Sequence, residues 1–549
     1  MATPSTRENA ENGRRQSAAA PDVDAVVVGA GFSGLYMLHR LRDLGLSVRV
    51  FERGSGVGGT WYWNRYPGAR CDTDSVEYSY QFSDALQQEW RWTERFATQP
   101  EILRYLEHVA DRFDLRRDIA FGTTVTEAAF DEAAGCWHIA TDDGARLSAT
   151  YCIMATGCLS APNRPAFDGL DRFAGDWYHT GAWPHEGVSF AGQRVGIVGT
   201  GSSAIQSIPL IAAEASHLTV FQRQANYTIP ARNAPLDAAR YAGIRARYGE
   251  LRRNAKQTPN GCWWPVNPAA ADEMSPLEQR RELEARWEKG GLRMYNVFKD
   301  VLVNDKANDI AAAFIREKIR ELVHDPQVAA QLSPHSFIGC KRICLDTDYY
   351  ETFNRPNVTL VDISDAPIEE ITQSGLRTGG TEHALDTIVF AIGFDAMTGP
   401  LLSIDIRGRG GRTLKAKWAD GPRSYLGLAM EGFPNLFTIT GPSSPSVLTN
   451  MVPAIEQHVE WIAACIDHAR ACGRPCIEAS RAAEDAWIAH HDEVAAGTLF
   501  PGCNSWYVGA NVAGKPRKVT PYTGGFPAYI EKCEAVVANG YEGFTLTAA

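Results

Sequence analysis

The amino-acid sequence predicts an α/β protein with two Rossmann-like dinucleotide-binding domains and a helical insertion. Three observations predict this fold class. A glycine-rich turn follows an apolar strand near residue 29, the same pattern recurs near residue 199, and the stretch 235–334 shows helical features instead. At 549 residues, the chain is also too long for one ordinary hydrophobic core.

Composition excludes several classes of protein. The chain carries 54 Lys and Arg against 65 Asp and Glu, a formal charge of −11, so it lacks the basic surface that binds nucleic acid. No apolar run reaches about 18 residues, so we expect no membrane span. We expect a cytoplasmic enzyme that acts on a small molecule as a monomer or a weak homo-oligomer.

Residues 1–20 are interpreted as a disordered leader. Arg14 and Arg15 could begin a twin-arginine export signal, but Asp22 and Asp24 interrupt the apolar region that such a signal needs. This reasoning favours the cytoplasm as the compartment.

The 12 cysteines are scattered through the chain, and in a reducing compartment we expect most of them to be small buried side chains. Two CxxxC pairs, Cys340 with Cys344 and Cys472 with Cys476, have neither metal-ligand spacing nor the spacing of a flavin-linked redox disulfide. We therefore predict no metal site.

The first dinucleotide site begins at the apolar strand that ends at Val28. Gly29-x-Gly31-x-x-Gly34 follows, then a helical pattern, then a second strand that ends at Glu52, 23 residues after Gly29. The glycines allow a tight turn and close approach of a pyrophosphate, which the free amides of the helix N-terminus bind. The terminal acid can accept the ribose hydroxyls of an adenosine. This pattern favours FAD over the alternative of a purely structural glycine turn.

The second site repeats the pattern with one informative change. Gly199-x-Gly201-x-x-Ala204 opens a helix, and the position that corresponds to Glu52 is Gln222, followed by Arg223. Loss of the acid removes a charge that would repel a 2′-phosphate, and an arginine can bind that phosphate through two hydrogen bonds. The second site therefore suits NADPH, and two such sites in one chain imply electron flow from nicotinamide to flavin.

Domain boundaries follow from these patterns. The FAD domain is expected over residues 21–155 and 388–549, the NADPH domain over 160–234 and 335–387, and the helical insertion over 235–334. In the insertion, Ser275-Pro276-x-Glu278 is a capping box, and Ile315 and Ile319 belong to the apolar stripe of a second helix. The charges on the other face of that helix, including Glu317, are expected to be solvated.

Several ordered motifs carry a resemblance to a known family. They include GGTWYWNRYPGARCD from Gly58, GCKRICLDTDYYETFNRPNV, SWYVGANVAGKP and the segment that contains Phe173, Gly175, His179, Trp183 and Pro184. From about residue 24 to near its end, the chain resembles the type I Baeyer–Villiger monooxygenases, the phenylacetone and steroid enzymes in particular. Flavin N- and S-oxygenating relatives end the last of these motifs differently, in Tyr or Phe.

The resemblance implies a reaction. NADPH reduces FAD, O2 adds to give a C4a-peroxyflavin, and this attacks a bulky hydrophobic ketone, whether aryl, cyclic or steroidal, to yield an ester or lactone plus water. NADP+ stays bound during turnover, and sulfoxidation of thioethers is expected as well.

The resemblance also assigns two catalytic residues. On sequence alone Arg342 is an exposed or salt-bridged arginine and Asp72 a turn aspartate. In the family, an arginine at this place lies over the flavin and keeps its charge next to a peroxide, which a lysine could lose. Asp72 would hold Arg342 by a charge-assisted pair.

The remaining site residues follow from the glycine turns and the resemblance together. The expected FAD contacts are Gly29, Gly31, Ser33, Gly34, Glu52, Gly59, Thr60, Trp61, Asp72, Tyr78, Val125 and Met451. The expected NADP contacts are Arg70, Thr200, Gly201, Ser202, Ser203, Gln206, Arg223, Gln224, Lys341, Arg342 and Trp506. The expected substrate pocket consists of Cys158, Leu159, Val447, Leu448 and Met451.

Alternatives remain open at this point. His179 and Trp183 could equally be a capping histidine and an aromatic side chain on a loop, and the family links this segment to domain motion more than to proton transfer. The same cofactors could serve oxygenation of an amine or thioether. A third possibility is a reductase or redox sensor that does not oxygenate.

Overall fold

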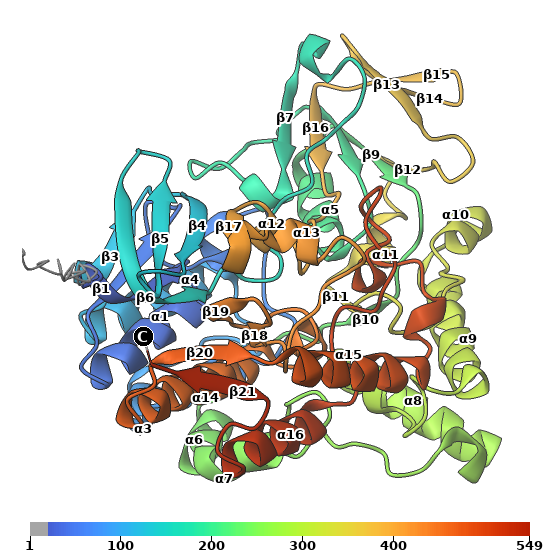
Figure 1. The fold of residues 1–549 in the computed structure, drawn as a ribbon. Helices are drawn as coiled ribbons and strands as arrows, with labels where there is room; N and C mark the ends of the chain where they lie inside the picture. Colours follow the sequence, from blue (N-terminus) through green and yellow to red (C-terminus); the bar gives the residue numbers. More distant parts are fainter. Residues whose placement is uncertain (1–19, 549) are drawn as a thin grey trace, which may run out of the picture.

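The computed structural model describes residues 20–548, and the predicted leader lies outside them except for Ala20. Two parallel-strand sheets dominate the arrangement, with a group of helices beside the second (Figure 1). Among the described residues, no helix is long and apolar enough to cross a membrane.

The first sheet has nine strands, and its parallel centre is formed by β1 between β2 and β6. β4 and β5 extend it as antiparallel strands, and β19, from far along the chain, pairs parallel with β6. The strands are β1 (Val23–Val28), β2 (Val48–Glu52), β3 (Ile119–Phe121), β4 (Val125–Asp131), β5 (Cys136–Thr141), β6 (Arg146–Met154), β17 (Asp405–Arg407), β18 (Ala429–Met430) and β19 (Phe433–Thr438).

Helices from both ends of the chain cover this sheet. α1 packs against α14, so the N-terminal glycine turn and the C-terminal half share one core. The helices are α1 (Phe32–Asp43), α2 (Thr60–Trp63), α3 (Asp84–Glu89), α4 (Gln99–Arg112), α12 (Gly399–Leu402), α13 (Leu414–Lys417), α14 (Met451–Ala471), α15 (Arg481–Ala496) and α16 (Phe526–Ala538). A two-stranded antiparallel sheet of β20 (Cys476–Ala479) and β21 (Phe544–Thr547) lies beside them.

The second sheet is fully parallel, in the order β12-β9-β8-β16-β7. Its strands are β7 (Asp176–His179), β8 (Arg194–Val198), β9 (His217–Gln222), β12 (Val358–Asp362) and β16 (Thr387–Phe390). The neighbouring elements are α5 (Ser202–Glu214), β10 (Thr228–Pro230), β11 (Cys344–Asp346), α11 (Tyr349–Thr352) and the antiparallel sheet of β13 (Ile368–Thr372), β14 (Gly375–Thr378) and β15 (Thr381–Ala384).

One predicted boundary is wrong. We expected the strand near residue 388 to return to the first sheet, but β16 lies in the second sheet between β8 and β7. All four residues of β16 are buried. A fully buried, mostly apolar strand of this kind fits the centre of either sheet, so its sequence does not tell which sheet it joins.

Five helices occupy the stretch where we expected the insertion. They are α6 (Ala238–Ala246), α7 (Tyr248–Lys256), α8 (Pro276–Lys289), α9 (Asp305–Leu322) and α10 (Pro326–Gln331). The Ser275 capping box at the start of α8 is present. Leu283 of α8 and Ile315 of α9 share a core with the second sheet, whereas Tyr241 of α6 packs into the core of the first.

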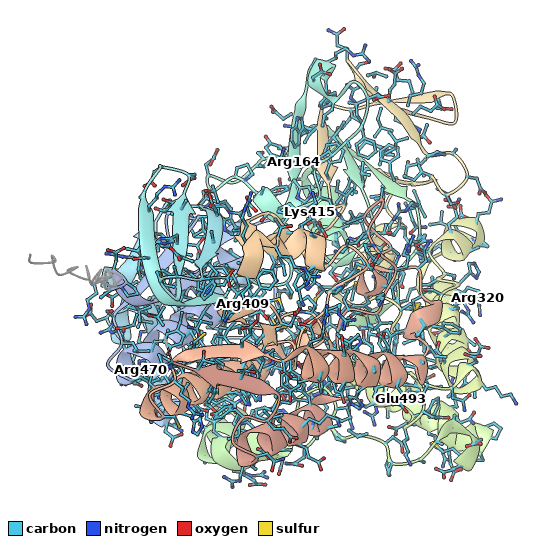
Figure 2. The ribbon with its side chains drawn as sticks, in the orientation of Figure 1. Arg164, Arg320, Arg409, Lys415, Arg470 and Glu493 are labelled. Atoms are coloured by element: carbon cyan, nitrogen blue, oxygen red, sulfur yellow. A yellow bond between two sulfur atoms is a disulfide. The ribbon has the colours of Figure 1, made fainter. Side chains whose placement is uncertain are left out.

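The charged face of α9 is only partly solvated. Arg320 is exposed (Figure 2), as expected. Glu317, however, accepts two hydrogen bonds of 2.7 Å from Arg280 of α8, and Arg316 donates to the carbonyl of Pro334 at 3.2 Å. These bonds join α9 to its neighbours, which a single-helix pattern does not reveal.

Candidate active site

The first glycine turn has the geometry that a dinucleotide needs. Gly29 has a φ of +105°, and a Cβ there would lie 2.6 Å from the carbonyl oxygen of Ala155. A Cβ at Gly34 would lie 1.8 Å from the carbonyl oxygen of Gly29, so α1 packs directly on the turn. No side chain caps the N-terminus of α1 at Gly31, which leaves its first amides for an anion.

Glu52 lies at the end of β2, as predicted, and faces this turn. Its carboxylate accepts hydrogen bonds of 2.7 Å from the backbone amides of Ala30 and Gly54. Burial raises the pKa of Glu52, although the two amides oppose that rise. The carboxylate is thus fixed next to the glycine turn, where an adenosine ribose would bind.

Four further expected FAD residues are Gly59, Thr60, Trp61 and Tyr78, and Gly59 lies directly against this turn. A Cβ at Gly59 would lie 2.9 Å from the Cα of Gly31, so two glycine backbones meet and leave no side chain between them. Trp61 donates from Nε1 to the hydroxyl of Tyr78 at 3.2 Å, and Thr60 begins α2. These contacts fit a flat ring system and a pyrophosphate held against backbone.

Three further expected FAD residues belong to three different elements of this unit. Val125 begins β4, two residues after Thr123, whose amide donates to the carbonyl of Glu52 at 3.0 Å. Met451 begins α14 and packs against the buried core. Ser33 is buried in the first turn of α1.

The second glycine turn repeats this geometry at the end of β8. Gly199 has a φ of +112°, and a Cβ there would lie 2.5 Å from the carbonyl oxygen of Ala391. Gly201 has open space around its Cβ position, and no side chain caps α5 there. The turn therefore offers room and free amides for a second pyrophosphate.

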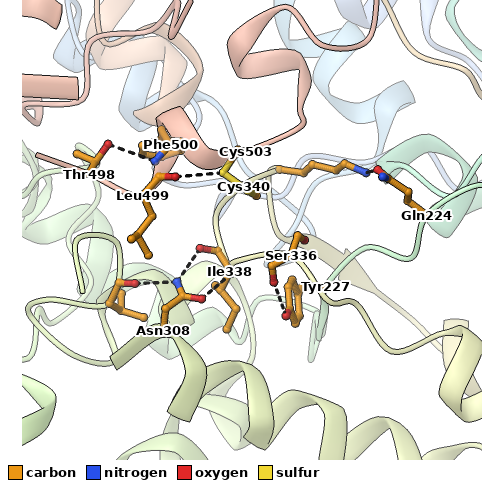
Figure 3. Close-up of a disulfide and its surroundings, with 12 residues drawn as sticks. Gln224, Tyr227, Asn308, Ser336, Ile338, Cys340, Thr498, Leu499, Phe500 and Cys503 are labelled. Atoms are coloured by element: carbon orange, nitrogen blue, oxygen red, sulfur yellow. Dashed lines mark hydrogen bonds between the residues drawn. A yellow bond between two sulfur atoms is a disulfide. The ribbon is translucent and has the colours of Figure 1, made fainter. Parts of the chain in front are cut away.

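Cationic side chains gather beside the second turn. Arg223 and Gln224 are exposed after β9, and Lys341 donates from Nζ to Oε1 of Gln224 at 3.0 Å (Figure 3). Burial and the nearby charge of Arg223 lower the pKa of Lys341, which places the two cations close together. Gln222 instead turns inward and donates to the carbonyl of Gln331 at 2.8 Å.

Three further expected NADP residues, Thr200, Ser202 and Ser203, form hydrogen bonds within the second unit. Thr200 donates from its hydroxyl to the carbonyl of Gln224 at 2.7 Å, next to the cations. Ser202 and Ser203 begin α5, where their hydroxyls contact Cys344 at 3.1 Å and Thr180 at 3.1 Å.

A bridge from α5 reaches the first unit. Gln206 donates from Nε2 to the carbonyl of Arg70 at 3.1 Å and accepts a hydrogen bond of 2.9 Å from the hydroxyl of Tyr66. The guanidinium of Arg70 binds Glu94 at 3.0 Å, so its charge is already paired. These contacts join the two glycine-turn units.

Arg342 and Asp72, 270 residues apart in the sequence, form the expected charge-assisted pair, and it is bidentate. Nε of Arg342 lies 2.5 Å from Oδ2 of Asp72, and Nη2 lies 2.9 Å from Oδ1. The third nitrogen, Nη1, donates to the carbonyl of Val447 at 2.7 Å. Burial alone would lower the pKa of Arg342, but the charge and hydrogen bonds of Asp72 raise it well above its ordinary value.

The expected pocket residues come together in one apolar cluster beside Arg342. Cys158 and Val447 are buried there, and Leu159, Leu448 and Met451 are partly buried against them. Trp506 also packs in this cluster, and its ring centroid lies 4.1 Å from that of Tyr507. The sequence prediction missed five further members, which are Ala396, Met397, Phe500, Tyr507 and the partly buried Val519.

Comparisons with known proteins assign the chain to a family. A family profile described as pyridine nucleotide-disulphide oxidoreductase matches residues 26–236. The chain is 43% identical over 529 residues to an acetone monooxygenase (methyl acetate-forming) from Gordonia sp., with 96% of this chain and 99% of that protein covered. It is 45% identical over 524 residues to a Baeyer–Villiger monooxygenase from Pseudooceanicola batsensis, with 95% of each covered. The chain belongs to the Baeyer–Villiger monooxygenase family.

Solved structures agree with this family. A steroid monooxygenase bound to NADP is 53% identical, with a TM-score of 0.92 over 96% of this chain and all of that one. A structure titled OTEMO in complex with FAD and NADP is 39% identical, with a TM-score of 0.93 over 96% of this chain and all of that one.

One sequence relative carries the name of a different activity. A phenazine N-monooxygenase from Lysobacter antibioticus is 44% identical over 527 residues, with 95% of this chain and 97% of that protein covered.

In this Baeyer–Villiger monooxygenase, His179 ends β7 and acts as a cap. Its Nδ1 accepts a hydrogen bond of 2.9 Å from the amide of Gly181, and its buried Nε2 has no partner. Trp183 is buried against Tyr178 and Phe190. The local geometry matches the interpretation of this motif as a capping histidine and a packed aromatic residue.

The other fingerprint positions lie in the same segment. Phe173 is partly buried against an apolar cluster that includes Phe390 of β16, and Pro184 directly follows Trp183. A Cβ at Gly175 would lie 2.1 Å from the carbonyl oxygen of Asp386, so only glycine fits there.

The cysteines differ from the expectation in one respect. We expected no redox role for the pair Cys340 and Cys344, but Cys340 forms a disulfide with Cys503, 163 residues away. The other ten cysteines are free, and of these only Cys472 is exposed. Within residues 20–548, no group of His, Cys, Asp or Glu side chains could hold a metal ion.

The sequence prediction missed two features of the site. Tyr507 is buried next to Arg342 and lies in the motif SWYVGANVAGKP beside Trp506, but a tyrosine by itself indicates only a core position. The disulfide joins two segments whose proximity depends on the tertiary fold.

Proposed function

We propose that this Baeyer–Villiger monooxygenase uses FAD and NADPH to convert an apolar ketone and O2 into an ester or lactone plus water. The observation that supports this most strongly is Arg342, which Asp72 holds while its third nitrogen donates to the carbonyl of Val447 in the apolar cluster. A fixed cation beside an apolar cluster suits a reaction in which negative charge develops on oxygen.

The two cofactors are assigned to different units. FAD binds the first sheet, because Glu52 lies at its glycine turn, and residues 21–155 belong to this unit together with the chain after β16. NADPH binds the second sheet, because Arg223 and Lys341 lie beside its turn. The hydroxyl of Ser505 and Oδ1 of Asn511 are buried without partners near Trp506, which fits a polar ligand there.

When bound, FAD reduced by NADPH supplies the activation of O2. Arg342 keeps its positive charge throughout, because Asp72 raises its pKa well above the ordinary value. Its guanidinium stabilises negative charge on oxygen during the attack on the carbonyl carbon. Asp72 acts as a positioning residue, since it occupies Nε and Nη2 and fixes the plane of the guanidinium.

The apolar cluster binds the ketone. Cys158, Val447 and Leu448 exclude water and contact the substituents of the carbonyl, and burial raises the pKa of the Cys158 thiol, so it stays neutral. We propose an aryl, cyclic or steroidal ketone, because all five expected pocket positions carry side chains without a charge.

A panel of substrates tests this function. Purified enzyme, NADPH and O2 are incubated separately with acetone, cyclohexanone, an aryl ketone and a steroidal ketone, and with phenazine and a thioether. We expect esters or lactones from the cyclic, aryl or steroidal ketones, with slower conversion of acetone. The 44% identical phenazine enzyme makes N-oxygenation the competing outcome. N-oxide formation without any ester would favour that activity.

We further propose a cytoplasmic enzyme that is a monomer or a weak homo-oligomer. The acidic charge of −11 favours a dispersed protein over a surface-bound one. Sedimentation at several concentrations tests this state, and a stable tetramer would contradict it.

A further inference from the structure

We propose that the Cys340–Cys503 disulfide is a redox-sensitive tether that holds the segment 500–508 at the active site. Its reduction by a dithiol releases this segment and weakens the binding of NADP+. The part that concerns NADP+ rests on the proposed function, whereas the tether itself does not.

The tether joins two segments that carry site residues. Cys340 directly precedes Lys341 and Arg342, and Cys503 lies three residues before Trp506 (Figure 3). The two Cα atoms are 5.3 Å apart. One covalent bond therefore connects the segment that carries Lys341 and Arg342 to the aromatic segment that contains Trp506.

The Cys340 side of the tether is rigid. Asn308 of α9 is fully buried, donates to the carbonyl of Ile338 at 3.0 Å, and accepts from its amide at 2.9 Å. The hydroxyl of Tyr227 donates to the carbonyl of Ser336 at 2.7 Å. The segment 336–342 is thus fixed to the second unit independently of the disulfide.

The Cys503 side depends more on the tether. Between Leu499 and Asn511 the chain forms two short 3-10 turns, Phe500–Gly502 and Trp506–Val508, and no longer helix or strand. Thr520 holds its centre, because its amide and its hydroxyl each donate to the carbonyl of Tyr507 at 2.9 Å, and Asn511 donates to the carbonyl of Phe394 at the far end. The hydroxyl of Ser505 is buried in this stretch without a partner. Because regular hydrogen-bonded structure is sparse here, loss of the covalent bond should increase local opening.

A dithiol needs local opening to reach the bond. Both cysteines are buried, and the hollow that they line with Leu302, Leu499 and Phe500 has no space for a water molecule, so the sulfur atoms become accessible only when the segment 500–508 moves. In thiol–disulfide exchange, the two thiols of the reductant transfer two electrons and two protons, leaving two cysteine thiols and one reductant disulfide. A peroxide reverses the change by accepting two electrons and two protons, and hydrogen peroxide then yields two waters.

The compartment gives this bond its regulatory meaning. In a reducing cytoplasm, disulfides that persist are usually transient or redox-sensing. A bond that can be broken there would couple the redox state of the thiol pool to cofactor retention.

The first measurement counts thiols. Alkylation of the denatured holoenzyme without reductant should label ten of the twelve cysteines, and peptide mapping should show Cys340 and Cys503 protected. Treatment with dithiothreitol should expose both. Twelve labelled cysteines without reductant would overturn the proposal.

The second measurement compares the oxidised and reduced holoenzyme. Hydrogen–deuterium exchange in residues 500–511 should rise on reduction, while exchange in 336–342 stays unchanged. If release lowers the competent population of the segment to about a tenth, the Kd for NADP+ rises roughly tenfold. Hydrogen peroxide should restore both values. Equal exchange and equal Kd in the two forms would overturn the proposal.

Variants separate the tether from other thiol effects. Cys503→Ser and Cys340→Ser, without reductant, should reproduce the Kd of the reduced wild type, and the matched control Cys472→Ser, at an exposed free cysteine, should keep the oxidised values. If a variant does not fold, the reduced wild type still decides the question. Neither measurement uses a ketone, so absence of ester formation would refute the proposed function and leave the tether standing.

Discussion

At the residue scale, the central feature is the guanidinium of Arg342, in which each of the three nitrogens donates a hydrogen bond. Arg342 binds Asp72 with two of them and the carbonyl of Val447 with the third. This arrangement fixes the plane of the cation at the border of the apolar cluster. A lysine would place one point charge there and could satisfy only part of these contacts.

Replacement of Arg342 should stop ketone oxidation. We expect Arg342→Ala to lower kcat for ester formation about 100- to 1000-fold, the usual effect of removing a preorganised charge donor. Arg342→Lys should recover only part of this loss. The measurement is ester yield at saturating NADPH, with bound FAD as a control for folding. Unchanged ester formation in Arg342→Ala would contradict the assigned role.

Replacement of Arg223 should affect only the phosphorylated cofactor. Because Arg223 is exposed, we expect its contact with the 2′-phosphate to contribute only about 1–2 kcal/mol of binding free energy. Arg223→Ala should therefore raise the KM for NADPH roughly 5- to 30-fold. The KM for NADH should hardly change. An equal rise for both nucleotides would place the 2′-phosphate elsewhere.

At the scale of elements, the sequence predicts what is local. The glycine turns at Gly29 and Gly199 and the capping box at Ser275 lie where expected, because turn geometry and helix starts depend on neighbouring residues. The predicted sheet for the strand Thr387–Phe390 is wrong, because the sequence of a buried, mostly apolar strand does not indicate which strands it pairs with. The Cys340–Cys503 bond was missed because its members are 163 residues apart.

Helix α14 contains a buried carboxyl group that should make stability depend on pH. Glu456 accepts hydrogen bonds from the amides of Gln81 and Phe82, and burial raises its pKa to about 7. The folded chain therefore holds this proton more tightly than the unfolded chain. Its contribution to the free energy of unfolding is present below about pH 4.5 and is lost as the pH rises through about 7.

Replacement by glutamine should flatten that dependence. Glu456→Gln keeps an oxygen acceptor and removes the titration, so the Tm of the variant minus that of the wild type should rise between about pH 5 and about pH 8. The corresponding change in the difference between their free energies of unfolding is at most about 3 kcal/mol. The matched control is Glu493→Gln at the exposed face of α15 (Figure 2). A Tm difference that is constant over this pH range would contradict the prediction.

At the scale of the whole molecule, the proposed site exists only where the two units meet. Asp72 and Val447 come from the first unit, whereas Arg342 precedes β11 beside the second. Gln206 and Tyr66 join the units at the same interface. The family resemblance could assign these residues individually, but their convergence follows from the packing of the two sheets and the helices between them.

Oxygen labelling tests the central claim most directly. The enzyme is incubated with NADPH and cyclohexanone, and with an aryl and a steroidal ketone separately, under ¹⁸O₂, and the products are analysed by mass spectrometry. The account predicts an ester or lactone that contains one ¹⁸O atom, with one NADPH consumed per product. NADPH oxidation that yields only labelled hydrogen peroxide, with no ester from any of these ketones, would contradict it.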